Sequence, residues 1–534
     1  MFPRQDLRSP ELLLKRFLVA SMLLVCAAAC SRKEPDPSRE KKGFSSRDCV
    51  TVGLRWEPRT FNPFRSVDSA SYFAQSLVYS GLLRYGGMGQ IEPDLASSFT
   101  ILKSDSSSDR TYRFLLREDI FFSDGSKITV DDVVRSIKEA CGPRSPFRNN
   151  FQLLKKIDSH DRQILVTFGG QDVSLPSRFV DLKILPARIL DGGKDFNWER
   201  EPISSGVFKV KQWRSGQQIV FERNPGYWDK KSRPDYRQLF WRVIPDKKLL
   251  AMALLRNEID MASLDGREAS RLMEQSSDLQ VERIKGARVV FLGFNLSKWP
   301  YTDKAVRQSL SMMINRKAIN EKLFGDYSHV PESEFSENKK LATTVNLAAA
   351  FRKLKETGFE LENDRWVQGG RPLSLRVVTV SDFLDIGQAI VSDLKRGAVE
   401  AELEVVEYST LKDQYLKEGN FDLVLFSRSV GPVPDPRMFW STTGSLNYSK
   451  YHNPRMDKLI AYGSQAASIE EKQKYNLMAG KLIAEDLPWI YLARPDLLIV
   501  HNRRIKKVVI GNQRLVGIPW NNEVQNARFW KIAP

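Results

Sequence analysis

Three hydrophobic runs separated by two amphipathic segments constrain the fold of this chain more than any other feature. Residues 374–380 (SLRVVTV), 401–408 (AELEVVEY) and 421–427 (FDLVLFS) have the length and the β-branched content of strands. The intervening segments, DIGQAIVSDLKRG and TLKDQYLKEG, have the apolar spacing of helices. This alternation predicts a βαβαβ unit, in which helices cover a parallel sheet.

The same alternation predicts where a ligand binds. In open parallel sheets, ligands bind beyond the carboxyl ends of the strands. The loop after the third run, residues 427–440 (SRSVGPVPDPRMFW), contains three prolines and two aromatic residues. We therefore expect this loop to contribute to a binding site.

An apolar run near the N-terminus indicates export. Two basic residues precede FLVASMLLVCAAAC, which is shorter than the roughly 20 apolar residues of a membrane span. The run predicts a signal peptide over residues 1–29, cleaved before Cys30. The three alanines before Cys30 resemble the lipobox of bacterial lipoproteins, although Leu is usual where Ala27 stands. The alternative is an ordinary signal peptide followed by a chance cysteine.

The lipobox resemblance implies that Cys30 carries the lipid anchor. Two or three acyl chains, palmitate among them, suffice for stable membrane attachment. Residues 30–47 are charged and poor in large apolar side chains, so they predict a flexible tether. We expect the product to lie on a bacterial membrane and to face the periplasm or the exterior.

Composition excludes several classes of function. The chain has four cysteines and four histidines, with no histidine pair at helical spacing, no Gly-x-Ser-x-Gly elbow and no phosphate-binding loop. We expect no metal site, no cofactor and no enzymatic activity. The net charge is +17, but the basic residues are interleaved with acidic ones along the chain. This pattern favours a solvated surface near anionic lipids over nucleic-acid binding.

The body of the chain after residue 48 is too long for one core and predicts two or three domains. Within it, residues 116–140 have clear local signals. Asp124-Gly125 predicts a turn, and Thr129 with Asp132 predicts a capping box at the start of a helix. Whether Cys49 pairs with Cys141 stays open at this point.

Several long segments together resemble the bacterial extracellular solute-binding proteins of family 5, which serve peptide and nickel ABC importers. One departure is Asn257, where the family usually has Gly. The segment that contains the predicted turn and capping box stands where the family has a strand, a turn and a capped helix. The other segments that carry the resemblance are residues 77–99, 205–236, 244–262 and 291–319.

The resemblance implies a two-lobed α/β periplasmic-binding-protein fold with an extra domain, in which helices flank mixed parallel sheets. Lobe I is expected to combine residues 48–80, 200–285 and 495–534. The additional domain is expected over residues 81–199 and lobe II over residues 286–494. The chain crossings between the lobes are expected to act as a hinge, and ligand contacts in both lobes would favour a closed state.

The resemblance also implies a function. We expect a monomeric binder without catalysis, which captures oligopeptides and delivers them to an ABC permease with its ATPase subunits. One alternative is a non-peptide cargo, such as a nickel chelate, haem or another small solute. Another is a lipoprotein that does not transport and acts in sensing, envelope chaperoning or adhesion.

The predicted site loop departs from the pattern of peptide-binding relatives. In those proteins an Asp shortly before an Asp/Glu-Pro pair commonly binds the amino terminus of the peptide. Alignment on Asp435-Pro436 places Pro432 at that position, and Ser429 stands where a Trp is often found. The usual amine clamp is therefore missing. Arg428, next to Ser429, is expected to favour a ligand carboxylate. The alternative is that Arg428 is a structural arginine.

A second loop, FRSVDSASY, resembles the segment that lines the ligand from the first lobe. Val67, Asp68 and Ser69 are its candidate ligand-binding residues. Asp68 is the obvious alternative partner for an ammonium group, and it is equally suited to cap a helix that begins at Ser69. Tyr72 and Trp440 are expected either to line a pocket or to belong to the core.

Overall fold

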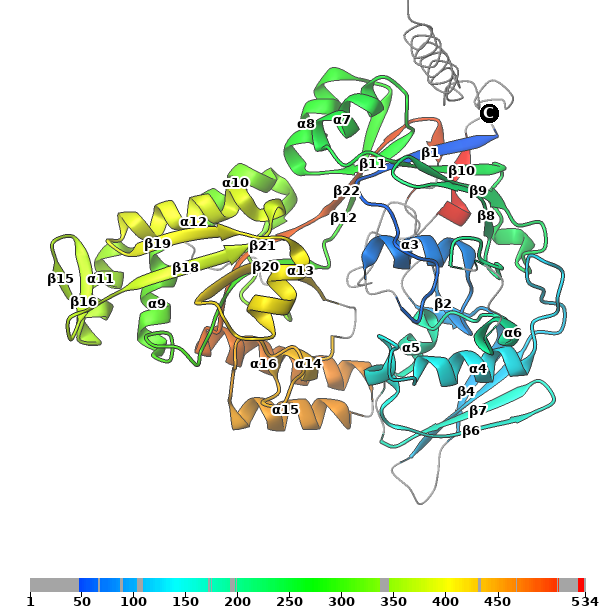
Figure 1. Ribbon diagram of the computed structural model, residues 1–534, viewed down its shortest axis with the longest axis horizontal. Helices are drawn as coiled ribbons and strands as arrows, with labels where there is room; N and C mark the ends of the chain where they lie inside the picture. Colours follow the sequence, from blue (N-terminus) through cyan, green and yellow to red (C-terminus); the bar gives the residue numbers. More distant parts are fainter. Residues whose placement is uncertain are drawn as a thin grey trace, which may run out of the picture. The chain divides into compact units, whose positions relative to one another are not determined.

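A computed structural model describes most of the chain after the N-terminal segment (Figure 1). The predicted signal peptide, Cys30 and the tether lie outside the described residues, as do Val67 and Pro432. In the part of the chain that is described, no helix combines the length and the apolar character needed to cross a bilayer. The described residues are 48–65, 68–86, 90–102, 109–170, 173, 175–192, 197, 199–336, 345–430, 434–466, 468–506, 508 and 527–532.

A seven-stranded sheet brings together strands from distant parts of the sequence. Its order is β12 (Leu279–Ile284), β22 (Leu497–Asn502), β11 (Met261–Leu264), β1 (Cys49–Leu54), β10 (Gln238–Val243), β9 (Gln218–Arg223) and β8 (Phe208–Arg214). All six residues of β1 are buried, which explains why its sequence, CVTVGL, is almost continuously apolar. Helices α7 (Lys247–Leu255) and α8 (Gly266–Gln275) pack their apolar faces against β11 and β22.

A buried carboxylate fastens the C-terminal segment to this sheet. Asp260 accepts a hydrogen bond from the Thr51 backbone N–H at 2.7 Å. Both of its oxygens also accept from the Arg504 guanidinium, at 2.9 and 2.5 Å. Such a bidentate pair satisfies a carboxylate that would otherwise be costly to bury.

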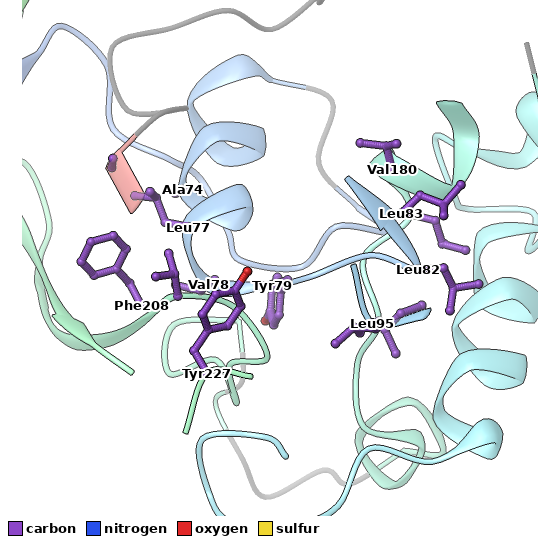
Figure 2. Close-up of a cluster of buried hydrophobic side chains, with 14 of the residues drawn as sticks. Ala74, Leu77, Val78, Tyr79, Leu82, Leu83, Leu95, Val180, Phe208 and Tyr227 are labelled. Carbon is purple, nitrogen blue, oxygen red and sulfur yellow. The ribbon is translucent and has the colours of Figure 1, made fainter. Parts of the chain in front are cut away.

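A four-stranded antiparallel sheet follows in the sequence. Its order is β4 (Ala96–Leu102), β5 (Arg110–Leu116), β7 (Gln163–Phe168) and β6 (Leu154–His160). Helices α4 (Val130–Ala140), α5 (Leu175–Asp181) and α6 (Ala187–Leu190) and the hairpin of β2 (Leu83–Tyr85) and β3 (Ile91–Pro93) lie nearby (Figure 1). The two sheets share one continuous cluster of buried apolar residues, part of which Figure 2 shows around α3 (Ser69–Val78).

The predicted turn and capping box are confirmed. Gly125 has a φ of 86°, the left-handed conformation that glycine adopts without strain. Thr129 and Asp132 exchange hydrogen bonds at the start of α4. Asp132 also accepts from the Ala187 backbone N–H at 2.7 Å, which fixes α6 against α4.

A six-stranded sheet contains the predicted βαβαβ unit. Its order is β14 (Ser328–His329), β21 (Trp489–Pro495), β13 (Arg288–Phe294), β20 (Leu423–Ser429), β18 (Ser374–Thr379) and β19 (Glu400–Val405). Strand β18 pairs in parallel with both β19 and β20, so the prediction is confirmed. Helix α12 (Leu384–Arg396) makes the first connection, and α13 (Tyr408–Thr410) continues into a π-helical turn over Leu411–Leu416 in the second.

Helices cover both faces of the six-stranded sheet through three separate buried clusters. No disulfide joins Cys49 to Cys141 in the described part of the chain. The remaining helices of this half are α9 (Lys304–Met313), α10 (Arg316–Phe324), α11 (Leu347–Glu356), α14 (Arg437–Trp440), α15 (Pro454–Ser464) and α16 (Ile469–Asp486). The predicted residue bounds of lobe I, the additional domain and lobe II stay predictions.

Replacing Asp132 tests the junction between α4 and α6. Asp132→Ala removes the N-cap partner of Thr129 and leaves the buried Ala187 N–H without an acceptor, so we expect the free energy of unfolding to fall by about 2 kcal/mol. Urea denaturation measures the change. Asp131→Ala, at the exposed neighbouring position, is the control and should cost well under half as much. Equal losses for the two variants would contradict the assigned role of Asp132.

Candidate functional site

The candidate site lies at the edge of the six-stranded sheet where the parallel strands β18 and β20 end. Asp382 follows the end of β18, and Ser429 is the last residue of β20. Strand β13 runs the other way and begins at this edge, with Arg288 directly opposite Ser429 in the ladder. The edge is therefore the one at which ligands bind in open parallel sheets.

Arg288 is the exposed residue at the start of an otherwise buried strand. Neither an ion pair within 4.0 Å nor a side-chain hydrogen bond engages its guanidinium among the residues that the structure describes. Surrounding protein lowers the pKa of Arg288 by desolvation, Asp382 opposes this effect, and the positive charge of Arg55 adds to it. The Arg288 side chain is thus accessible from solvent and flanked by protein, so it can bind a charged group of a ligand.

Asp382 has a partner other than Arg288. The Arg55 Nη2 donates to Asp382 Oδ1 at 3.4 Å, and Arg55 Nε donates to the Pro245 carbonyl at 3.1 Å. The Arg55 guanidinium also lies 4.7 Å from the centre of the Trp56 ring. Two arginines thus face one carboxylate at this edge, which leaves an excess of positive charge.

Aromatic rings flank the same edge. Phe426 of β20 lies 6.4 Å from the Phe383 ring and 5.9 Å from the Tyr408 ring, measured between centroids. Tyr408 follows β19 and is 56% exposed. Partial desolvation raises the pKa of its hydroxyl, which is protonated at neutral pH even at its ordinary pKa and can donate a hydrogen bond. The rings offer apolar surface beside the arginines.

Arg428, predicted to favour a ligand carboxylate, lies against a buried carboxylate of the protein. Its Nη1 is 3.2 Å from Glu334 Oε1, and its side chain is only 11% exposed. The Trp440 indole donates to the same oxygen at 2.8 Å, and the Arg428 guanidinium lies 3.7 Å from the centre of the Phe439 ring. Burial raises the pKa of Glu334, and the charge of Arg428 acts against that rise. The arrangement is that of the structural arginine named as the alternative.

The second predicted loop contains a helix cap. Asp68 Oδ1 accepts from the Ser71 backbone N–H at 2.8 Å, and Oδ2 accepts from the Ser71 hydroxyl at 2.8 Å. Ser69 is the exposed first residue of α3. Capping, one of the two roles considered for Asp68, is therefore present. The ligand-binding roles of Asp68, Ser69, Arg428 and Ser429 stay predictions.

The two aromatic candidates differ in their surroundings. Trp440 is 1% exposed and belongs to a buried cluster, as a core residue does. The Tyr72 hydroxyl donates to Asp181 at 2.6 Å, and Tyr72 lines a cavity within the first core cluster.

Sequence reasoning missed Arg288, Asp382 and Glu334. Arg288 stands just before the apolar run VVFLGF, of which only FLGF belongs to a segment that carries the family resemblance. An isolated arginine before a strand gives no sign of a binding role unless its cross-strand partner is known. The loop of Glu334 carried no signal at all, because its partners come from distant segments.

Among the residues that the structure describes, no three or more His, Cys, Asp or Glu side chains are grouped so that they could hold a metal ion.

Comparison with known families decides the membership of the chain. The family model described as bacterial extracellular solute-binding proteins, family 5 Middle, matches residues 90–450. The chain belongs to this family. Family 5 proteins are the solute-binding components of ABC importers and act outside the cell or in the periplasm. The expected family is therefore confirmed.

Curated relatives of this family 5 protein cover nearly its whole length. The oligopeptide-binding protein AppA of Bacillus subtilis is 26% identical over 519 residues, 90% of this chain and 93% of AppA. The heme-binding protein A of Haemophilus influenzae is 25% identical over 529 residues, 88% and 91% of the two chains. The nickel-binding periplasmic protein of Escherichia coli is 24% identical over 495 residues, 86% and 90% of the two chains. These relatives are solute-binding transport proteins with different cargoes.

Solved structures confirm the fold class. NikZ from Campylobacter jejuni in complex with Ni(L-His) superposes with a TM-score of 0.78 at 22% identity, covering 91% of this chain and all of NikZ. AppA from Bacillus subtilis in complex with a nonapeptide gives a TM-score of 0.77 at 23% identity, covering 91% and 99%. The chain therefore has the two-lobed α/β periplasmic-binding-protein fold that was expected.

Removing the Glu334 carboxylate tests the structural assignment of Arg428. Glu334→Ala leaves a buried guanidinium without its counter-charge, so we expect the free energy of unfolding to fall by about 3 kcal/mol or more. Glu332→Ala, two residues away at a partly exposed position, is the control and should cost less than about 1 kcal/mol.

The double variant Glu334→Ala/Arg428→Met completes this test. Removing both charges should cost clearly less than the sum of the single substitutions, because the unpaired charge is gone. Urea denaturation of the four proteins gives the coupling. Additive losses would show that Arg428 and Glu334 do not depend on each other.

Proposed function

We propose that this chain is the substrate-binding lipoprotein of an ABC importer, which captures oligopeptides between two lobes and delivers them to a permease with its ATPase subunits. The observation that carries the proposal is the Arg288 guanidinium, which lies opposite Ser429 at the ligand-binding edge of the sheet and has no ion pair within 4.0 Å among the described residues. The predicted lobes and their hinge are part of the proposal.

The chemistry of Arg288 fits the carboxylate of a peptide. A guanidinium can donate two parallel hydrogen bonds to a carboxylate, which gives both energy and orientation. In this assignment Arg288 takes the role that was expected for Arg428, since Arg428 is engaged by Glu334. Similarity to the oligopeptide-binding AppA, which was solved with a nonapeptide, supports a peptide cargo.

A second candidate cargo is a small carboxylate-rich solute or metal chelate. The excess of Arg55 and Arg288 over Asp382 would suit an anionic ligand of any kind. Structural neighbours of the chain include proteins solved as an EDTA-binding protein and in complexes with Ni(L-His) and agropinic acid. The test of the proposal therefore has to separate peptides from other anions.

Titration with peptides tests Arg288 directly. We expect tripeptides to pentapeptides with a free C-terminal carboxylate to bind the purified protein, and Arg288→Gln to weaken this binding about tenfold or more. Isothermal titration calorimetry measures the affinities. Arg352→Gln, at an exposed position of α11 far along the chain, is the matched control and should bind as the wild type does.

C-terminally amidated peptides sharpen the same test. Amidation should weaken binding to the wild type and make little further difference to binding by Arg288→Gln, because both changes remove the same interaction, the one between Arg288 and the peptide carboxylate. If amidation weakens binding equally in both proteins, Arg288 does not hold the carboxylate. If no peptide binds and a nickel–histidine chelate or a small carboxylate does, the second cargo replaces the first.

We also propose that Cys30 anchors the protein to a membrane facing the periplasm or the exterior. Cys30→Ala should move the protein from the membrane fraction to the soluble fraction and abolish labelling with radioactive palmitate, because the acyl chains supply the anchor. Cell fractionation and labelling measure both effects. Cys26→Ala is the control and should leave both unchanged. Unaltered membrane attachment of Cys30→Ala would rule out the lipid anchor.

A further inference from the structure

A cavity of about 100 Å³ lies within the core that joins the first two sheets, away from the edge where Arg288 stands. Its apolar wall includes Leu77, Leu83 and Val180, which Figure 2 shows together with Tyr79 and Tyr227. Its polar wall includes Tyr79, Arg84, Tyr85, Asp94, Lys183 and Arg528. Pockets for drug-sized ligands are roughly 300 Å³ or larger, so only a small group fits here.

Lys183 is the least satisfied charge of this wall. It is 6% exposed, and its ammonium donates one hydrogen bond, to the Val180 carbonyl at 3.0 Å. No ion pair within 4.0 Å engages Lys183 in the described part of the chain; its other close neighbour is the Tyr72 ring, at 5.6 Å. Burial lowers the pKa of Lys183, and the charges of Asp181 and Asp94 oppose that effect. An ammonium has three donors, so two of them have no acceptor from the described protein.

Two tyrosine hydroxyls of the wall are also without acceptors. Tyr79 is 3% exposed, and neither its hydroxyl nor that of Tyr85 has a hydrogen-bond partner among the described residues. Burial raises the pKa of both hydroxyls, so they keep their protons. The unsatisfied groups of Tyr79, Tyr85 and Lys183 are therefore all able to donate, and an occupant rich in acceptor oxygens would satisfy them.

The charged side chains that line the cavity are mostly positive, which also suits an anion. Arg84, Lys183 and Arg528 face the cavity together with a single carboxylate, Asp94. Arg84 pairs with Glu92 and Asp229 outside the lining and lies 4.0 Å from Asp94, and the negative charges of Asp181 and Asp94 act on Lys183. An anion that enters the cavity would therefore be stabilised by the donors of Lys183 that have no acceptor among the described residues.

We propose that this cavity binds a small oxyanion, a phosphate or a carboxylate, which accepts hydrogen bonds from Lys183, Tyr79 and Tyr85. The site is separate from the peptide site and does not depend on the cargo of the importer. Its walls come from α3, from the β2–β3 hairpin, from the segment after α5 and from Arg528 near the C-terminus. An anion bound there would hold these four segments together.

Calorimetric titration of the purified protein with phosphate and, separately, with acetate tests the site in a Tris-chloride buffer free of oxyanions. We expect at least one of the two to bind and to raise the melting temperature. Lys183→Met should weaken binding about tenfold or more, and Tyr79→Phe should weaken it several-fold without disturbing the packing. Lys127→Met, at an exposed position of the same part of the chain, is the matched control and should bind as the wild type does. Preference for phosphate or acetate identifies the kind of oxyanion.

Three results would overturn the proposal. The first is that neither anion binds at millimolar concentration, which would make this a water-filled cavity. The second is that Lys183→Met and Tyr79→Phe bind as the wild type does. The third is that Arg288→Gln abolishes anion binding, which would place the anion at the sheet edge. Because Tyr79→Phe removes one oxygen only, it gives a clear result even if Lys183→Met does not fold.

Discussion

The antiparallel ladder between β13 and β20 is the constraint on which the candidate site depends. It joins two strands that are far apart in the sequence, and its register places Arg288 opposite Ser429. A shift of one residue would turn the guanidinium toward the other face of the sheet and bury a charge in the core. The apolar residues that follow Arg288 in β13 are all buried and so hold this register. The position of the binding group is thus set by core packing.

Buried charge is handled in two different ways in this protein. Asp260 with Arg504 and Glu334 with Arg428 are oppositely charged pairs, and each joins segments distant in the sequence, although Arg428 Nε and Glu334 Oε2 are buried without a hydrogen-bond partner among the described residues. Lys183 has no such partner in the described part of the chain. Removing one member of a buried ion pair is costly, so the two pairs have a structural role. A buried charge without an ion-pair partner is instead a candidate binding site for a ligand. This contrast separates Arg428 from Arg288 and Lys183.

Local signals were sufficient to predict much of the fold from the sequence. The βαβαβ unit follows from hydrophobic periodicity, and the cap at Thr129 and Asp132 follows from side-chain chemistry within one turn. The family resemblance supplied the two-lobed architecture. The second crossover departs from a regular helix at Leu411–Leu416, a feature that periodicity does not encode.

The site was less predictable, for a physical reason. The partner of Arg428 is Glu334, and the neighbours of Arg288 are Asp382 and Arg55, all brought together by tertiary pairing that one sequence does not reveal. The predicted residues Val67 and Pro432 lie outside the described residues.

A crystal structure of the protein with the ligand that co-purifies with it tests the central claim most directly. The account predicts a ligand carboxylate in hydrogen-bonding contact with Arg288, with the pair of Arg428 and Glu334 intact. A ligand carboxylate bound to Arg428, with Glu334 displaced, would contradict it.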